Sequence, residues 1–479
     1  MRTLTVMLGL FLVLVCAGCG SNNGGVTGFI PTGNFSNASL SGQYVYQIEG
    51  FDFNASASGV PYREAGVFTA NGNGAITSAT DDVSEGSTVL TTVSTGTYAI
   101  SNDGTGSLTL NSALGTVHLA VTMVSASKVY LIEGDTFVNG GGLAEKQDST
   151  AIAAAPAGTF VFREHDVTAT QSVSRVGVFT VSGGAVSSGN EDVNTSGVLT
   201  SLTFTGTFNG PDSATGRGTG NFNDSSLATS SFIYYIMDAN NIRFLPSNLN
   251  ALGSARAEKQ NGTATLSGSY AFASSGDTFN FLGGVNSAGR FNASAGSITA
   301  GELDSVQDTN VIATDLSFTG TYTQAGTRAL ISLNTTSNSN LVVWMVSPSR
   351  AFFLVNDPNT VQEGTMDLQT TSSFSNSTTN GQYALVMDGF DTSTKNRVGT
   401  LQWDGSGKLT LNAFVNGGGV VNFPVLISGN YTVSGNGRAA GSLSGLSNNL
   451  VFYLISGTDA YVVQNDPGVQ ISGSMSKQR

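Results

Sequence analysis

The chain repeats one sequence pattern four times, and this repeat limits the possible folds more than any other feature. Each copy opens with glycine, a variable residue and an aromatic residue: Gly42-Gln43-Tyr44, Gly158-Thr159-Phe160, Gly268-Ser269-Tyr270 and Gly381-Gln382-Tyr383. Each copy closes on a glutamine, and these glutamines are 109 to 113 residues apart: Gln147, Gln260, Gln369 and Gln478. Such a period is the size of a small domain and too long for a solenoid unit. We therefore predict four domains, at residues 39–148, 156–260, 266–369 and 380–479.

Within each repeat, apolar and polar residues alternate with the period of a β-strand. In the first opening strand, Tyr44, Tyr46 and Ile48 share one face, which predicts a strand with an aromatic core side. Glycine-rich turns then separate further strands, about eight in each copy. This pattern predicts an all-β chain of four tandem antiparallel meander units. We favour small β-barrels, because the first strand can pair with the last and leave no exposed edge. β-Sandwiches remain the alternative.

One strand in each of the last three copies is apolar on both faces. These strands are Phe232–Met237, Leu341–Val346 and Leu450–Ile455. A strand of this kind is covered on both sides. We therefore expect either another repeat or a second sheet to pack outside it.

The first residues indicate export. Leu4 to Val15 is an apolar run too short to span a bilayer, which suits a signal peptide over residues 1–18. The following Cys16-Ala17-Gly18-Cys19 resembles the lipobox of bacterial lipoproteins, and this resemblance implies cleavage before Cys19 and lipid attachment to it. Cys16 departs from the lipobox, which usually has leucine there, so an ordinary signal peptide cut nearby is the alternative. Residues 19–38 are polar and glycine-rich, which predicts a flexible tether.

The chain as a whole resembles uncharacterised multi-repeat β lipoproteins of soil bacteria. It is similar more loosely, in strand count and Gly-x-aromatic motifs, to small meander barrels such as the avidins. The first resemblance implies no known activity, and no binding residue is transferred from the second. Together with the lipobox, the first resemblance implies a protein lipid-anchored in the bacterial cell envelope, at the outer membrane or cell surface.

Composition excludes several kinds of site. Both cysteines lie in the signal region, so the mature body has no disulfide, thiolate nucleophile or cysteine zinc site. The net charge of −13 argues against nucleic acid and against anionic lipid headgroups. We therefore expect membrane contact only through the lipid on Cys19, and no cofactor.

Few residues suggest catalysis or metal binding. A Ser-His-Asp triad would need His118 or His165, and both occupy positions that are polar in the other copies, which favours solvated strand residues. Acidic residues recur after the second strand of three copies and could hold Ca²⁺, but solvated strand ends are the simpler interpretation. These acids are Asp81-Asp82, Glu191-Asp192, and Glu302 with Asp304, whereas the fourth copy has residues 413–417 there without an acid. Trp344 falls in a buried strand, and Trp403 precedes a turn and is a candidate exposed stacking residue.

The sequence favours a non-enzymatic, lipid-anchored envelope protein with a structural, adhesive or binding role. Its partner would be an envelope polymer, a protein or a small apolar ligand. The alternative is a carrier that encloses a small apolar ligand in its barrels, and a carbohydrate-active enzyme comes third. The volume left open inside the barrels distinguishes the structural or binding protein from the carrier, because a carrier needs a cavity of about 300 Å³ or more. Residues such as Tyr44, Phe68 and Tyr98 are expected to fill the barrels.

Overall fold

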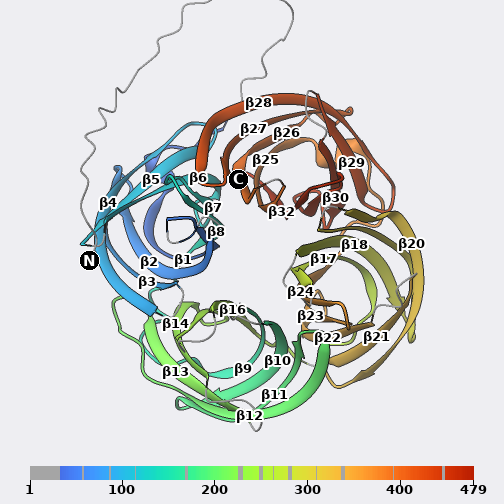
Figure 1. Cartoon of the computed structure of the whole chain (residues 1–479), viewed down its shortest axis with the longest axis horizontal. Helices are drawn as coiled ribbons and strands as arrows, with labels where there is room; N and C mark the ends of the chain where they lie inside the picture. Colours follow the sequence, from blue (N-terminus) through green and yellow to red (C-terminus); the bar gives the residue numbers. More distant parts are fainter. Residues whose placement is uncertain are drawn as a thin grey trace, which may run out of the picture. The chain divides into compact units, whose positions relative to one another are not determined.

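A computed structural model describes residues 33–479 apart from short gaps. The residues not described there are 55, 57–58, 86–87, 114, 168–170, 225–229, 248–251, 263, 279–282, 309, 336–339, 392 and 445–447. The described chain is all-β and forms four closed antiparallel barrels of eight strands each. The predicted fold class is confirmed, and the pairing of each first strand with each last strand excludes sandwiches. Figure 1 shows the barrels in chain order, from blue to red.

The first two barrels occupy the N-terminal half of the chain. Barrel 1 consists of β1 (Ser41–Asp52), β2 (Val60–Asn71), β3 (Ala75–Glu85), β4 (Thr88–Ile100), β5 (Thr105–Ser112), β6 (Gly115–Ser125), β7 (Lys128–Glu133) and β8 (Val138–Lys146). Barrel 2 consists of β9 (Gly158–Val167), β10 (Ser172–Ser182), β11 (Ala185–Thr195), β12 (Val198–Phe208), β13 (Arg217–Asp224), β14 (Ser230–Asp238), β15 (Asn241–Pro246) and β16 (Leu252–Lys259).

The last two barrels follow the same plan. Barrel 3 consists of β17 (Gly268–Thr278), β18 (Gly284–Ser294), β19 (Ser297–Gln307), β20 (Asn310–Ala325), β21 (Arg328–Asn334), β22 (Asn340–Ser347), β23 (Arg350–Asp357) and β24 (Thr360–Leu368). Barrel 4 consists of β25 (Gly381–Phe390), β26 (Lys395–Trp403), β27 (Lys408–Gly417), β28 (Val420–Val433), β29 (Arg438–Leu443), β30 (Asn448–Leu454), β31 (Asp459–Gln464) and β32 (Gln470–Lys477).

The repeated aromatic motifs meet inside each barrel. Tyr44 of β1 pairs with Phe68 of β2, and their rings stack 5.4 Å apart. Gly66, two residues before Phe68 in β2, gives such rings room, because a Cβ on Gly66 would lie 2.7 Å from the Tyr46 ring. In the other barrels the same paired positions are Phe160 with Phe179, Tyr270 with Phe291, and Tyr383 with Leu401. The motifs are therefore packing signals for the barrel core.

Trp403 belongs to this core. Its side chain is fully buried, and its ring lies 4.2 Å from that of Tyr431 and packs edge-on against Phe452. The interpretation of Trp403 as an exposed stacking residue was wrong. Trp403 is the last residue of β26, directly before the turn, and its side chain still lies inside the barrel.

Residues before the first strand close one end of barrel 1. The Phe35 N–H donates to the Asn102 carbonyl, and its ring packs against the barrel core. The short 3-10 helix η1 (Asn37–Ser39) follows, and Asn37 Oδ1 accepts from the Ile100 N–H. Residues 33–38 therefore lie on the barrel and do not belong to a free tether. In barrel 4, Phe374 and η2 (Asn376–Thr379) make the corresponding contacts.

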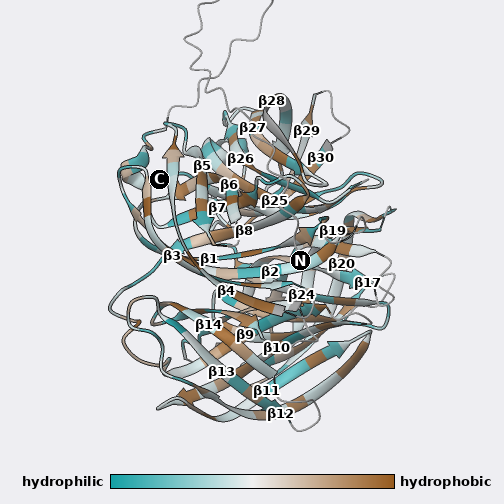
Figure 2. Cartoon of the chain, turned by 60° about the vertical axis from the view of Figure 1, so that its left-hand side comes forward, coloured by the Kyte–Doolittle hydropathy of each residue, from teal (hydrophilic) through white to brown (hydrophobic). Residues whose placement is uncertain are grey.

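The outer faces of the barrels pack against one another. Ile233, Tyr235 and Met237 of β14 cover Val45 and Val67 of barrel 1. β22 covers barrel 2 in the same way, and β30 covers barrel 3. The strands that are apolar on both faces are thus covered by another repeat, which decides between the two expected alternatives. Figure 2 shows hydrophobic and hydrophilic segments along the same strands.

The closing glutamines connect each barrel to the next, and the last one reaches the first barrel. Gln147 Nε2 donates to the Thr215 and Ile236 carbonyls of barrel 2, and Gln260 and Gln369 make the corresponding bonds to barrels 3 and 4. Gln478 Nε2 donates to the Asp103 and Met123 carbonyls of barrel 1, at 2.9 and 2.7 Å. The contacts between barrels therefore run in a closed circle.

Candidate functional site

The recurring aspartates lie buried at the contacts between barrels. Asp82 is fully buried and accepts from Arg217 Nε and Nη2, at 2.7 and 2.8 Å, and from the Tyr235 hydroxyl at 2.6 Å. The same contact joins Asp192 to Arg328 and Trp344, and Asp304 to Arg438 and Tyr453. The interpretation as solvated strand ends was wrong for these three aspartates, because each meets an arginine from the next repeat. It was also wrong for Asp81 and Glu191, which are buried.

The contact between barrels 4 and 1 is built differently. The strand register places Phe414 at the position of the three aspartates, and Thr105 and Thr122 at those of the arginine and the aromatic residue. Phe414 packs with Ala120, Val124 and other apolar residues of this interface. Asn416 also joins the two barrels, since its Nδ2 donates to the Glu133 and Val138 carbonyls. The fourth copy therefore has no acid at this position because its contact with barrel 1 is apolar there.

The two histidines have different surroundings. His118 is half exposed and lies 2.6 Å from Asp135, as expected for a solvated strand residue. His165 is largely buried, with Nδ1 2.8 Å from Ser174 Oγ and Nε2 3.1 Å from Asp277 Oδ2, so the solvated interpretation was wrong for it. The Ser174-His165-Asp277 chain contains the residue types of a hydrolytic triad, but Ser174 is fully buried. A substrate cannot reach its hydroxyl in this arrangement, which instead joins barrels 2 and 3.

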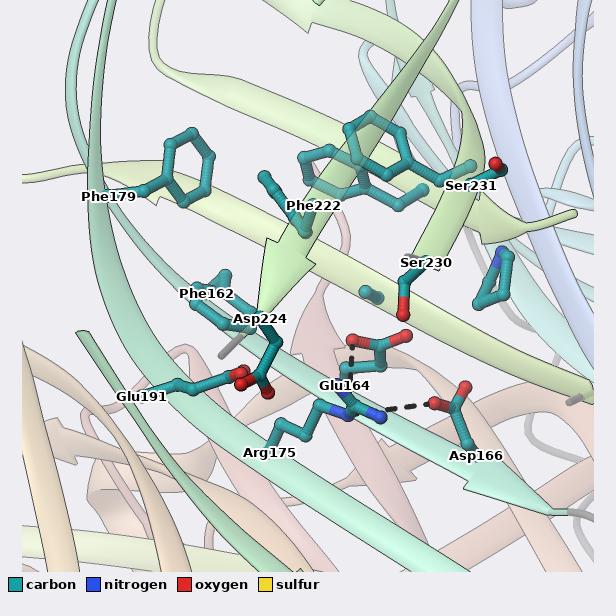
Figure 3. Close-up of a pocket in the computed structure, with 14 residues that line it drawn as sticks. Phe162, Glu164, Asp166, Arg175, Phe179, Glu191, Phe222, Asp224, Ser230 and Ser231 are labelled. Atoms are coloured by element: carbon teal, nitrogen blue, oxygen red, sulfur yellow. Dashed lines mark ion pairs between the residues drawn. The ribbon is translucent and has the colours of Figure 1, made fainter. Parts of the chain in front are cut away.

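Barrel 2 has a small cavity of about 50 Å³ in its lumen. Figure 3 shows Arg175 between Glu164 and Asp166, each 3.9 Å away, with Glu191 beside Asp224. Burial and Asp166 raise the pKa of Glu164, and burial raises the pKa of Glu191 to about 7. The cavity has room for a few water molecules and is far below the volume of a ligand site.

A larger, partly open cavity of about 570 Å³ lies where the four barrels meet. Equivalent positions of all four first strands line it, which are Gln47, Arg163, Ala273 and Val386, and so do their neighbours on the last strands, which are Leu143, Arg256, Thr365 and Ser474. Its volume is in the range of small-molecule sites. Sequence reasoning did not identify this cavity, since the residues facing it differ from copy to copy.

Charged groups line the cavity unevenly. Barrels 2 and 3 contribute four arginines, which are Arg163, Arg243, Arg256 and Arg350. Barrel 3 adds Glu363 and Asp367, and barrels 1 and 4 add Glu49, Lys128, Asp388 and Asp459. Burial and Glu49 raise the pKa of Asp388 to about 7. All the guanidinium groups of the cavity therefore come from barrels 2 and 3, whereas its carboxyl groups come from barrels 1, 3 and 4.

Other predicted features lie outside the described residues or have no counterpart among them. Cys19 and the signal peptide at residues 1–18 fall outside the described part of the chain. Within the described part, no group of three or more His, Cys, Asp or Glu residues is arranged to hold a metal ion. No helix there has the length and apolar character needed to cross a membrane.

Comparisons with known proteins add little. No known protein family matches the sequence, and no curated protein does. The crystal structure of the isotype 1 transferrin binding protein B from serogroup B Neisseria meningitidis is similar over 73% of this chain and 83% of that chain, at 10% identity and a TM-score of 0.20. This score is too low to support a statement about function, so the functional inference rests on the chemistry of the cavity.

Proposed function

We propose that this chain is an exported, non-catalytic binding protein that holds a small polar ligand in the cavity among its four barrels. The observation that carries the proposal is the cavity of about 570 Å³, lined by equivalent strands of every barrel. A closed circle of four barrels leaves such a space at its centre, and polar side chains from all four copies converge there. The proposed ligand site is thus formed by the four repeats together and not by one repeat alone.

Barrel filling argues against the alternative carrier of an apolar ligand. The described barrel cores are packed with aromatic rings, and the lumen cavity of barrel 2 holds about 50 Å³. Since a carrier needs several times this volume, the space among the barrels is the better candidate for a ligand site.

Anchoring by lipid on Cys19 is the second part of the proposal, supported by the Ala-Gly-Cys sequence after the apolar run. Attached acyl chains would hold the protein on a membrane surface. Cys19→Ser is expected to move the exported protein from the membrane fraction to the soluble fraction, as measured by cell fractionation. Unchanged membrane association of this variant would contradict the anchor.

The binding role can be tested by filling the cavity. Ser275 is an exposed residue of β17 that lines it, so Ser275→Trp should occupy the space without disturbing a barrel core. Thr321→Trp, on an exposed position of β20 outside the cavity, is the matched control. Calorimetry with citrate, glucose and spermidine should detect binding of at least one probe, weakened about tenfold or more by Ser275→Trp alone. If no probe binds, or if Ser275→Trp leaves the affinity of the bound probe unchanged, the proposed site is wrong.

A further inference from the structure

Barrel 2 places three arginines at cavity positions where the other barrels have none. Arg163 corresponds to Gln47, Ala273 and Val386, and its strand neighbour Arg256 to Leu143, Thr365 and Ser474. Arg243, next to Arg256 on β15, corresponds to Tyr130, Phe352 and Tyr461. Since three barrels close without arginine at these positions, the barrel fold does not require them.

The guanidinium groups gather around one aromatic ring. The Cζ atoms of Arg163, Arg256 and Arg350 lie 5.8, 5.3 and 5.7 Å from the centre of the Phe352 ring. An aromatic face attracts cations, but it does not neutralise them. Three like charges around one ring therefore need carboxylates or another anion nearby.

Carboxylates pair with every arginine of this group except Arg256. Arg163 pairs with Glu363, and Arg243 with Glu145. Arg350 donates to Glu258 at 2.6 Å and to Asp367 at 2.8 Å. Arg256 donates through Nη2 to Thr365 Oγ1 at 2.8 Å, and no ion pair reaches it from the described residues.

Several buried guanidinium nitrogens in this group have no hydrogen-bond partner among the described residues. They are Arg163 Nε, Arg243 Nη1 and Arg256 Nε. Arg243 is 6% exposed, so its Nη1 is an unpartnered donor on a deeply buried side chain that lines the cavity. Buried donors are almost always paired in folded proteins. Burial and the neighbouring arginines also lower the pKa of Arg256 to about 9, which a bound anion would counteract.

Two acidic residues of the cavity, Glu49 and Asp459, already have partners of their own. Glu49 pairs with Arg63 at 3.5 Å and accepts from Ser254. Asp459 accepts from Thr458 at 2.6 Å and from Ser476 at 2.8 Å. Asp388 also lines the cavity, from barrel 4, and is exposed to it. None of these acids forms an ion pair with Arg256.

We propose that the cavity binds a small oxyanion, a carboxylate or a phosphate, through Arg256 together with the free donors of Arg163 and Arg243. This inference rests on the proposed binding function and gives its ligand class. Guanidinium forks suit both kinds of anion, because they donate two parallel hydrogen bonds to a planar or tetrahedral group of oxygens.

Calorimetry of the full chain in detergent, with inorganic phosphate and citrate as probes, tests the proposal. Arg256→Gln should weaken binding about tenfold or more, since it removes a charge-assisted contact. Arg256→Lys should weaken it less, because the charge is kept and the fork is lost. Arg397→Gln is the matched control, a largely buried arginine of barrel 4 that does not line the cavity, and it should leave binding unchanged. A comparison of the affinities for phosphate and citrate shows whether the site prefers a phosphate or a carboxylate.

A measurement on the unaltered protein covers the case in which Arg256→Gln fails to fold. Phenylglyoxal modifies arginine, and saturating phosphate or citrate should slow modification of the Arg256 peptide severalfold, as followed by mass spectrometry. Equal modification rates with and without anion would overturn the proposal, as would anion binding that survives Arg256→Gln. If glucose binds and is blocked by Ser275→Trp while neither anion binds, the binding function stands and the anion class is wrong.

Discussion

At the scale of single residues, the same ring positions recur in each barrel with different hydroxyls. Tyr383 and Tyr44 are fully buried, whereas Phe160 occupies their position in barrel 2. The Tyr383 hydroxyl donates to the Gly457 carbonyl at 2.6 Å, so this ring has both a packing and a hydrogen-bonding role. Its pKa rises because burial disfavours the phenolate.

Substitution of Tyr383 separates these two roles. Tyr383→Phe should lower the free energy of unfolding by about 1 kcal/mol, the net value of a typical hydrogen bond. Tyr383→Ala should cost about 3–5 kcal/mol, because it removes a buried ring from a packed core. Denaturant melts of the full chain measure both changes, and equal tolerance of Ala and Phe would show that the ring is not a core residue.

Buried carboxyl groups in barrel 1 predict a dependence of stability on pH. Burial and Asp81 raise the pKa of Glu64 to about 8, and burial and Glu64 raise that of Glu133. Tyr46 and Tyr62 face the same groups. Because the pKa of Glu64 is raised in the folded state, its contribution to stability is greatest below about pH 4.5 and is lost as the pH rises toward 8.

Thermal melts between pH 5 and pH 9 test the direction of this pH dependence. The melting temperature should fall as pH rises, and Glu64→Gln should reduce the fall because its neutral amide does not titrate. Asp148→Asn, at an exposed acid whose pKa is lowered by its hydrogen bonds with Thr150, is the control and should leave the slope unchanged. A steeper fall in Glu64→Gln than in the unaltered protein would contradict the assignment.

At the scale of strands, the sequence predicts the barrel well and the contacts between barrels poorly. Gly-x-aromatic motifs report local packing, which each repeat satisfies within itself, so strand number and closure follow from them. Asp82 gives no such signal, because its partner Arg217 is 135 residues away in another repeat. Gln478 binds backbone carbonyls, which any sequence provides. The cavity escapes detection because equivalent positions there, such as Gln47, Arg163, Ala273 and Val386, have no residue type in common.

The contact between barrels 4 and 1 offers an exchange experiment. Phe414→Asp should lower the free energy of unfolding by roughly 2–3 kcal/mol, because it places an acid where no arginine is available. Adding Thr105→Arg and Thr122→Tyr to this variant recreates the residues found at the other three contacts and should restore much of the stability. Calorimetric melts decide this. If the triple variant is no more stable than Phe414→Asp alone, the four contacts are not equivalent.

At the scale of the whole molecule, the four barrels depend on their circular arrangement. Each barrel buries apolar residues of its outer face against a neighbour, and the main chain after every closing glutamine bonds to the next barrel. The Arg479 N–H donates to the Val124 carbonyl of barrel 1 at 3.0 Å, as Asp148 does to Met237 of barrel 2. Ring closure therefore creates the central cavity, and the ligand binding that we propose depends on it.

Cross-linking of paired cysteines tests this closure most directly, since the predicted mature body has no cysteine apart from Cys19. Gln382 of barrel 4 donates to the Asp103 carbonyl of barrel 1 at 3.2 Å, across 279 residues of sequence. With Asp103→Cys and Gln382→Cys, a short bismaleimide should join the two thiols within one chain in most molecules, as measured by intact mass and gel mobility. The control pair Asp103→Cys and Thr159→Cys, which uses the equivalent position in barrel 2, should not cross-link within one chain. Absence of the cross-link in the first double variant, or equal cross-linking of both pairs, would contradict a closed circle of barrels.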